Sequence, residues 1–215
     1  MIISVLGGTG KEGSGLAMRW AHAGHTVIIG SRDAEKARRA AEELNLALGN
    51  PVVAGEDNLT AATKADVVVL SVPYAAHRDT ILSVKDALAG KVIVDVTVPI
   101  HPTDFLRVMV PEGGSASKEA QALLDNGARV VTAFQNISAT HLKKLDATVD
   151  CDVLVCGDDD AAKQVGMRLA QDAGMKAWDA GPLDNASVVE GLTPVLLGIN
   201  RRHKVKGAGL RITLA

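Results

Sequence analysis

Aromatic residues and cysteines are scarce in this sequence. Its 215 residues include two Trp, one Tyr, two Phe and two Cys. So few aromatic rings exclude a nucleic-acid surface built on base stacking. Cys151 and Cys156 have no His or second Cys pair nearby, which excludes a zinc site there. We expect both thiols at core or strand positions, and their small number fits a reducing compartment.

Net charge and long apolar runs are limited as well. The 23 Lys and Arg residues nearly balance 25 Asp and Glu residues, so the chain has no basic field to hold nucleic acid. No segment approaches the ~18 to 20 consecutive apolar residues of a membrane span. The first residues lack the charged and apolar regions of a secretory signal. We therefore expect a cytoplasmic protein without nucleic-acid or membrane partners.

Short runs of Val, Ile and Leu alternate with Ala-rich helical patterns along the chain. This alternation is typical of a parallel sheet whose crossover helices cover both faces. The sequence predicts an α/β fold, a Rossmann-type doubly wound, mainly parallel sheet with a small C-terminal helical extension. We expect a dinucleotide-binding domain over residues 1–182, and a segment over 183–215 that completes a second-substrate cleft.

The expected elements follow from this rhythm. Strands are predicted at residues 2–6, 26–30, 52–53, 67–72, 92–96, 129–132, 153–156 and 175–178. Helices are predicted at residues 10–23, 33–48, 59–64, 75–89, 115–126, 159–173 and 185–204, and a basic tail at 206–215.

A glycine-rich turn lies between the first predicted strand and the first predicted helix. Its G-x-G-x-x-G spacing is typical of dinucleotide-binding sites: the first glycine permits a tight turn, the second lets the backbone approach a pyrophosphate, and the third lets the helix pack closely on the sheet. The helix N-terminus then faces the negative charge of the ligand. The alternative is an ordinary glycine-rich turn. The predicted cofactor-binding residues here are Gly8, Thr9, Gly10, Lys11, Glu12 and Gly13.

The end of the second predicted strand indicates which dinucleotide binds. An NAD site places Asp or Glu there, about 20 residues after the glycines, whereas this chain has Ser31 and Arg32. A hydroxyl and a guanidinium suit a 2′-phosphate, and Lys36 falls on the same face of the next helix. These residues predict NADP. The alternative is that Arg32 and Lys36 are solvated residues at a helix start, paired with Asp33 or Glu35.

Groups that would protonate a carbonyl substrate are missing. Hydride addition to a carbonyl needs a proton donor, but the only tyrosine, Tyr74, has Arg78 rather than Lys at the fourth place. The six histidines fall in helix or loop contexts where structural or solvated roles are common. Only about thirty residues follow Pro182, too few for a helical substrate domain. We therefore expect no catalytic side chain, and a large flat partner such as a second redox coenzyme.

Several sequence blocks together resemble one family. The blocks occur at residues 7–10, 29–32, 72–73, 98–99, 155–160, 179–183 and 192–194, and the resemblance runs from residue 2 to about 212. The Gly-Gly-Thr-Gly, Cys-Gly-Asp-Asp-Asp and Asp-Ala-Gly-Pro-Leu blocks are the most specific. They are similar to the NADPH-dependent coenzyme F420 reductases, also called F420H2:NADP oxidoreductases. The resemblance implies hydride transfer between NADP(H) and the deazaflavin coenzyme F420.

The resemblance also implies roles for individual residues. The 2′-phosphate would contact Thr9, Ser31, Arg32 and Lys36. The nicotinamide and its link to the pyrophosphate would contact Val72, Pro73, Val98 and Ala139, and the deazaflavin would contact Gln135, Ile137 and Ala208. This chain departs from the family at three of these or neighbouring places: the family carries His at Gln135, Pro at Ser138 and Leu at Ala208. The departures leave an ordinary flavin open as the partner.

Three further expectations concern assembly and charge. The resemblance implies a homodimer, with the helix at 185–204 as its contact or simply packed on its own sheet. The basic cluster Arg201, Arg202, Lys204, Lys206 and Arg211 would attract the anionic tail of the deazaflavin, or only complement a helix C-terminus. The run 158–160 is expected to cap a helix rather than bind metal.

Two alternative functions remain open from the sequence. One is an NADPH-dependent flavin or ferric reductase built on the same dinucleotide half. The other is a non-catalytic NADP-sensing module that acts through a partner.

Overall fold

The computed structural model describes residues 1–125 and 127–214. The predicted helix at 115–126 and the predicted tail at 206–215 each end on a residue outside the described ones, Asn126 and Ala215.

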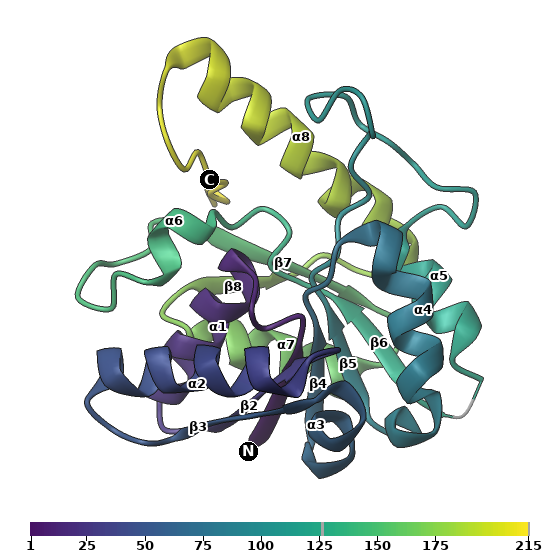
Figure 1. The fold of residues 1–215 in the computed structure, drawn as a ribbon. Coiled ribbons are helices and arrows are strands. Elements are labelled where there is room, and N and C mark those ends of the chain that lie inside the picture. Colours follow the sequence, from purple (N-terminus) through teal and green to yellow (C-terminus); the bar gives the residue numbers. More distant parts are fainter. Residues whose placement is uncertain (126, 215) are drawn as a thin grey trace.

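An eight-stranded sheet forms the centre of the described part of the chain (Figure 1). Its strand order is β3-β2-β1-β4-β5-β6-β7-β8. All neighbouring strands are parallel except β6 and β7. The strands are β1 (Ile2–Leu6), β2 (Thr26–Ser31), β3 (Val53–Asp57), β4 (Val67–Leu70), β5 (Val92–Asp95), β6 (Arg129–Thr132), β7 (Asp152–Gly157) and β8 (Lys176–Asp179). The order reverses between β1 and β4, where open α/β sheets bind ligands at the carboxyl ends of the strands. The predicted fold class is confirmed.

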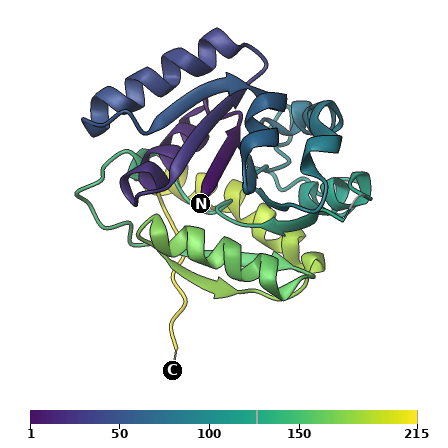
Figure 2. The same ribbon diagram turned by 90° about the horizontal axis from the view of Figure 1, so that it is seen from below.

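Helices cover both faces of the sheet (Figure 2). One face carries α1 (Lys11–His22), α2 (Ala34–Leu48) and α7 (Asp160–Asp172), and the other carries α3 (Asn58–Lys64), α4 (Tyr74–Val84) and α5 (Ala116–Leu123). Because both faces are buried, strands such as β4 read as continuous apolar runs.

Two local predictions were wrong, and one short helix was missed. The extended piece predicted at 52–53 is the longer edge strand β3, whose polar residues pair with β2. The Asn45 side chain holds the start of β3 through two hydrogen bonds of 2.8 Å, to the N and O of Val53. The helix predicted at 75–89 breaks into α4 and a 3₁₀ turn, η1 (Lys85–Leu88). A one-turn helix, α6 (Ala139–Leu142), was not predicted at all.

The C-terminal segment begins with a 3₁₀ turn, η2 (Leu183–Asn185), and continues as α8 (Ala186–His203), close to the predicted bounds. In Figure 1 α8 extends away from the sheet before the chain turns back. The tail returns to β7, because the Asp152 amide donates to Leu210 O at 2.7 Å. Among the described residues, none of the helices is both long enough and apolar enough to span a bilayer.

Candidate functional site

The glycine-rich loop joins β1 to α1 at the carboxyl edge of the sheet. Gly7 has a φ of +81°, so the left-handed turn lies one residue before the predicted first glycine. A Cβ on Gly13 would lie 2.9 Å from the Gly8 Cα, so only glycine lets α1 approach the loop this closely. Gly10 caps α1 without a side-chain hydrogen bond, which leaves first-turn N–H groups for an anionic ligand. The loop therefore fits a dinucleotide phosphate.

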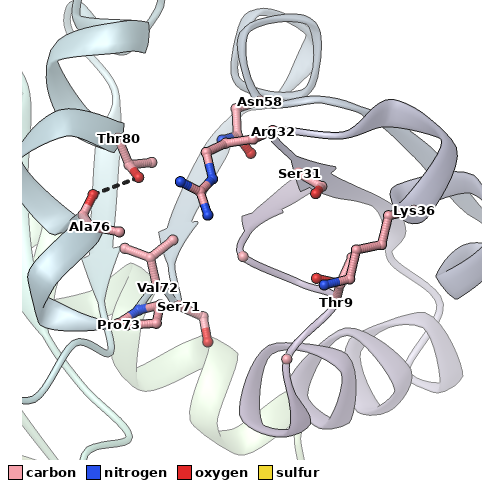
Figure 3. Close-up of a pocket in the computed structure, with 12 residues that line it drawn as sticks. Thr9, Ser31, Arg32, Lys36, Asn58, Ser71, Val72, Pro73, Ala76 and Thr80 are labelled. Atoms are coloured by element: carbon pink, nitrogen blue, oxygen red, sulfur yellow. Dashed lines mark hydrogen bonds between the residues drawn. The ribbon is translucent and has the colours of Figure 1, made fainter.

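A first cavity of about 280 Å³ opens beside this loop (Figure 3). It lies between the loop, the end of β2 and the start of α4. The side chain of Asn58, which begins α3, contributes a buried Oδ1 without a hydrogen-bond partner in the described residues. That oxygen can accept a hydrogen bond from a donor on a bound ligand. The cavity is lined by Gly7, Thr9, Gly10, Ser31, Arg32, Lys36, Asn58, Ser71, Val72, Pro73, Ala76 and Thr80.

Two cations face this cavity without a carboxylate partner. Figure 3 shows the Arg32 guanidinium directed over the cavity and the Lys36 side chain reaching toward Thr9. The acids expected in the alternative are engaged elsewhere: Asp33 caps α2 by accepting from the Lys36 amide at 3.2 Å, and Glu35 pairs with Arg38. Within the described residues, neither Arg32 nor Lys36 forms an ion pair, so both charges are available to an anion.

A second cavity of about 340 Å³ continues from the first. The two share Gly10, Ser71, Val72 and Pro73, so together they form one groove across the carboxyl ends of β1, β4, β5 and β6. The second cavity is additionally lined by Lys11, Glu12, Val96, Thr97, Val98, Ile100, Phe134, Gln135, Ile137 and Thr193. The groove thus brings together most predicted contacts of both coenzymes.

Gln135 presents an amide oxygen in the second cavity. Its Nε2 donates to Asp95 O at 2.6 Å, and its buried Oε1 has no partner among the described residues. The preceding residue, Phe134, has a φ of +76°, a strained conformation for a non-glycine residue that packing against Trp20 holds in place. Thr193 of α8 donates to Gln135 O at 2.6 Å and so ties the C-terminal segment to this cavity.

Glu12 lies in the first turn of α1 and also lines the second cavity. Its Oε1 is buried and has no hydrogen-bond partner within residues 1–125 and 127–214. Burial raises the pKa of Glu12 to about 8. A carboxyl group with this pKa is largely protonated at neutral pH, unlike an ordinary surface glutamate.

Some predicted residues lie outside the groove walls. Gly8 and Gly13 support the loop from within, Ala139 begins α6, and the Ala208 amide donates to Asn200 Oδ1 at 2.8 Å in the C-terminal tail. Some wall residues that directly follow strands, such as Ser71 after β4, were not predicted as site residues. The carboxyl-edge rule for α/β sheets identifies such positions once the strand ends are known.

Two charged motifs lie outside the residues that line the groove. Asp159 caps α7 by accepting from the Ala162 amide at 2.7 Å, which confirms the predicted capping role. In the basic cluster, Arg201 and Arg202 occupy the last turn of α8, where the helix dipole favours cations. Arg211 pairs with Asp150 at 3.0 Å.

Comparisons with known proteins agree with this geometry. The family model described as NADP oxidoreductase coenzyme F420-dependent matches residues 2–99. The F420-dependent NADP reductase of Methanothermobacter thermautotrophicus is 44% identical over 99% of this chain and 95% of its own. The metalloreductase STEAP3 of Rattus norvegicus is 32% identical over 88% of this chain, but over only 36% of its own length.

A solved structure has the same fold over its whole length. The crystal structure of a protein from Arthrobacter sp. FB24, provisionally assigned as an F420-dependent NADP reductase, superimposes with a TM-score of 0.81 at 25% identity and 99% coverage of both chains. Because the similarity to the methanogen reductase extends over nearly all of both sequences, the chain belongs to the F420-dependent NADP reductase family.

Proposed function

We propose that this protein transfers a hydride between NADP(H) and the deazaflavin coenzyme F420, with both bound in the groove. The observation that carries the proposal is the placement of two cations, Arg32 and Lys36, at one end of a groove whose other end is mainly apolar; neither cation forms an ion pair within the described residues. The full-length relatives named F420-dependent NADP reductases support the second coenzyme.

The first cavity would hold the adenosine half of NADP(H). Arg32 and Lys36 would neutralise the 2′-phosphate, with the hydroxyls of Thr9 and Ser31 beside them. The diphosphate would lie at Gly10, against the open N-terminus of α1.

The second cavity would hold the nicotinamide and the face of the second coenzyme. Val72, Pro73 and Val98 supply apolar walls, while Gln135 and Ile137 line the far side. Ala139 and Ala208 are proposed to join the site from α6 and the tail. When bound, the two coenzymes supply the redox chemistry, and the protein contributes close positioning and exclusion of water.

We further propose that residues 183–215 complete this cleft and that two chains associate as a homodimer in the cytoplasm. Thr193 in the cleft wall supports the first part. Exposed apolar side chains on α8, such as Val188 and Val195, and Val110 in the loop between β5 and α5 support a dimer contact. The two buried, unpaired thiols fit a reducing compartment. Sedimentation of the wild type and of Val195→Asp would test the dimer.

The test of the function is an acceptor series. NADPH oxidation is followed with F420, then FMN, then a ferric chelate, and each reaction is repeated with NADH. We expect fast turnover with NADPH and F420 alone. Turnover with FMN but not F420 would contradict the deazaflavin assignment, and tight NADPH binding without turnover would favour a sensing module.

A metalloreductase is the second candidate function. The specific observation in its favour is the 32% identity to STEAP3, which covers most of this chain. The chain spans about a third of that protein's length, and the match covers 88% of this chain. Ferric chelate reduction at a rate comparable with F420 reduction would support this candidate.

A further inference from the structure

Glu12 lies in the first turn of α1, in the wall of the second cavity. It follows the phosphate-binding glycine loop by two residues, yet it lines the second cavity rather than pairing with a cation. Its Oε1 is buried and unpartnered in the described part of the chain. A buried carboxylate without donors is costly, whereas a protonated carboxyl group is not.

Among the described residues that line the cavity, none forms an ion pair with Glu12. The β4–α4 loop contributes Ser71 and Pro73, the residues after β5 contribute Thr97 and Val98, and those after β6 contribute Gln135 and Ile137. Thr193 comes from α8. Among the residues that line the cavity, Lys11 is the only other ionisable one; it is exposed and forms no ion pair with Glu12 in the described residues.

Ligand binding in the groove would raise the pKa of Glu12 further. Gly10, at which the anionic diphosphate is proposed to bind, belongs to both cavities and stands two residues before Glu12. A nearby negative charge disfavours the carboxylate form, as does the further loss of water. The free group already has a pKa of about 8, so the nucleotide complex carries a neutral Glu12 at physiological pH.

The proposed reaction needs such a proton. Reduction of the deazaflavin by NADPH adds a hydride at ring carbon C5 and a proton at ring nitrogen N1, while NADPH supplies only the hydride. The proton has to come from a group in the cavity or from water. Of the two ionisable residues in the cavity wall, Lys11 is exposed, whereas Glu12 is half-buried with its Oε1 inaccessible to solvent.

We propose that Glu12 carries a proton in the NADPH complex and exchanges it with the second coenzyme as the hydride passes between the rings. This inference rests on the proposed function. In the forward direction the C4–H bond of the nicotinamide breaks and its electron pair forms the C5–H bond of the deazaflavin. The O–H bond of Glu12 breaks and its proton moves to N1. Glu12 ends as a carboxylate facing a nicotinamide that has become cationic, and it regains a proton from solvent.

The first test counts protons without turnover. NADPH is titrated into the protein near pH 9 by calorimetry, in two buffers of different ionisation enthalpy and without a second coenzyme. Wild type takes up about half to one proton, and NADPH affinity falls by up to about tenfold per pH unit above the pKa of free Glu12. NADP⁺ takes up fewer protons, because its cationic ring stabilises the carboxylate.

Matched variants identify the group. Glu12→Gln keeps the size and the neutral form and takes up no proton, whereas Glu43→Gln, which removes an exposed carboxylate of α2, behaves as wild type. Proton uptake that persists in Glu12→Gln, or that is missing in wild type, overturns the inference. Failure of NADPH to bind to wild type would instead contradict the proposed function.

The second test follows a single turnover of hydride transfer to F420 across pH. The wild-type rate declines as Glu12 loses its proton, and the Glu12→Gln rate is lower by about 100-fold or more and independent of pH in this range. Glu12→Asp, which keeps an acid one methylene shorter, recovers part of the rate and of the pH profile. Wild-type rates and an unchanged profile in Glu12→Gln would show that water supplies the proton.

Discussion

Replacement of Arg32 and Lys36 by alanine should weaken NADPH binding by an amount that can be worked out from the structure. Arg32 and Lys36 face the first cavity and have no carboxylate partner in the part of the chain that the structure describes, so each can form a charge-assisted hydrogen bond with a 2′-phosphate. Such bonds contribute about 1.5 to 3 kcal/mol each. Both side chains are exposed in the free protein, so the lower half of that range applies.

These energies translate into a coenzyme preference. Arg32→Ala is expected to weaken NADPH binding by about 10- to 30-fold, and the double variant with Lys36→Ala by about 100- to 1,000-fold, at 1.4 kcal/mol per factor of ten. NADH lacks the phosphate, so its affinity is expected to change by less than about threefold. The preference for NADPH should shrink as salt concentration rises.

Fluorescence titration with both nucleotides at fixed ionic strength measures the effect. Arg39→Ala is the matched control, because Arg39 is an exposed cation of α2 that lines neither cavity. Equal losses for NADPH and NADH, or an equal loss in the Arg39 control, would refute the assignment of the phosphate.

Three further outcomes are expected from the packing and burial of α1. The pKa of Glu12 is about 8 in the folded protein and 4.5 ordinarily, so the stability of the wild type falls as pH rises from about 4.5 to about 8. In urea denaturation, the free energy of unfolding of Glu12→Gln should exceed that of the wild type by about 2 to 4 kcal/mol at pH 9 and should equal it near pH 4. Gly13→Ala should lower the free energy of unfolding by about 1 to 3 kcal/mol. Gly10→Ala is the control, because its Cβ would meet only Gly7 O at 3.4 Å, and it should keep the wild-type stability. Similar thermal midpoints for the two variants would contradict the close packing at Gly13. The Arg19 guanidinium donates to the buried carbonyls of residues 142 and 173. Arg19→Met should therefore lower the free energy of unfolding by about 2 to 4 kcal/mol, and a smaller loss would mean that water replaces those hydrogen bonds.

The fold was predictable where burial dictates residue type. Strands β1 and β4 are buried on both faces and therefore read as apolar runs with sharp ends. Edge strand β3 lies outside that constraint: only its first residue, Val53, is fully buried, and its polar end is held by pairing with β2. The four residues of α6 are too few to show a helical period.

The site was predictable where one crossover supplies it. Thr9, Arg32 and Lys36 follow from the glycine spacing and from the residues that end β2, because the βαβ unit fixes where those positions lie. Thr193 comes from a helix that reaches the groove only through tertiary packing, and no local pattern marks it. The left-handed backbone of Phe134, which directs Gln135, is likewise imposed by the buried contact with Trp20 rather than by local sequence.

Direct hydride transfer between the two coenzymes can be followed with an isotope label. The protein is mixed with F420 and NADPH that carries deuterium at the transferred position of C4, and the reduced deazaflavin is examined by mass spectrometry and NMR. Direct passage between two coenzymes in one groove predicts that the deuterium appears at C5, one per molecule, without loss to water. Reduction with the label found in solvent, or no reduction of F420, would contradict the account.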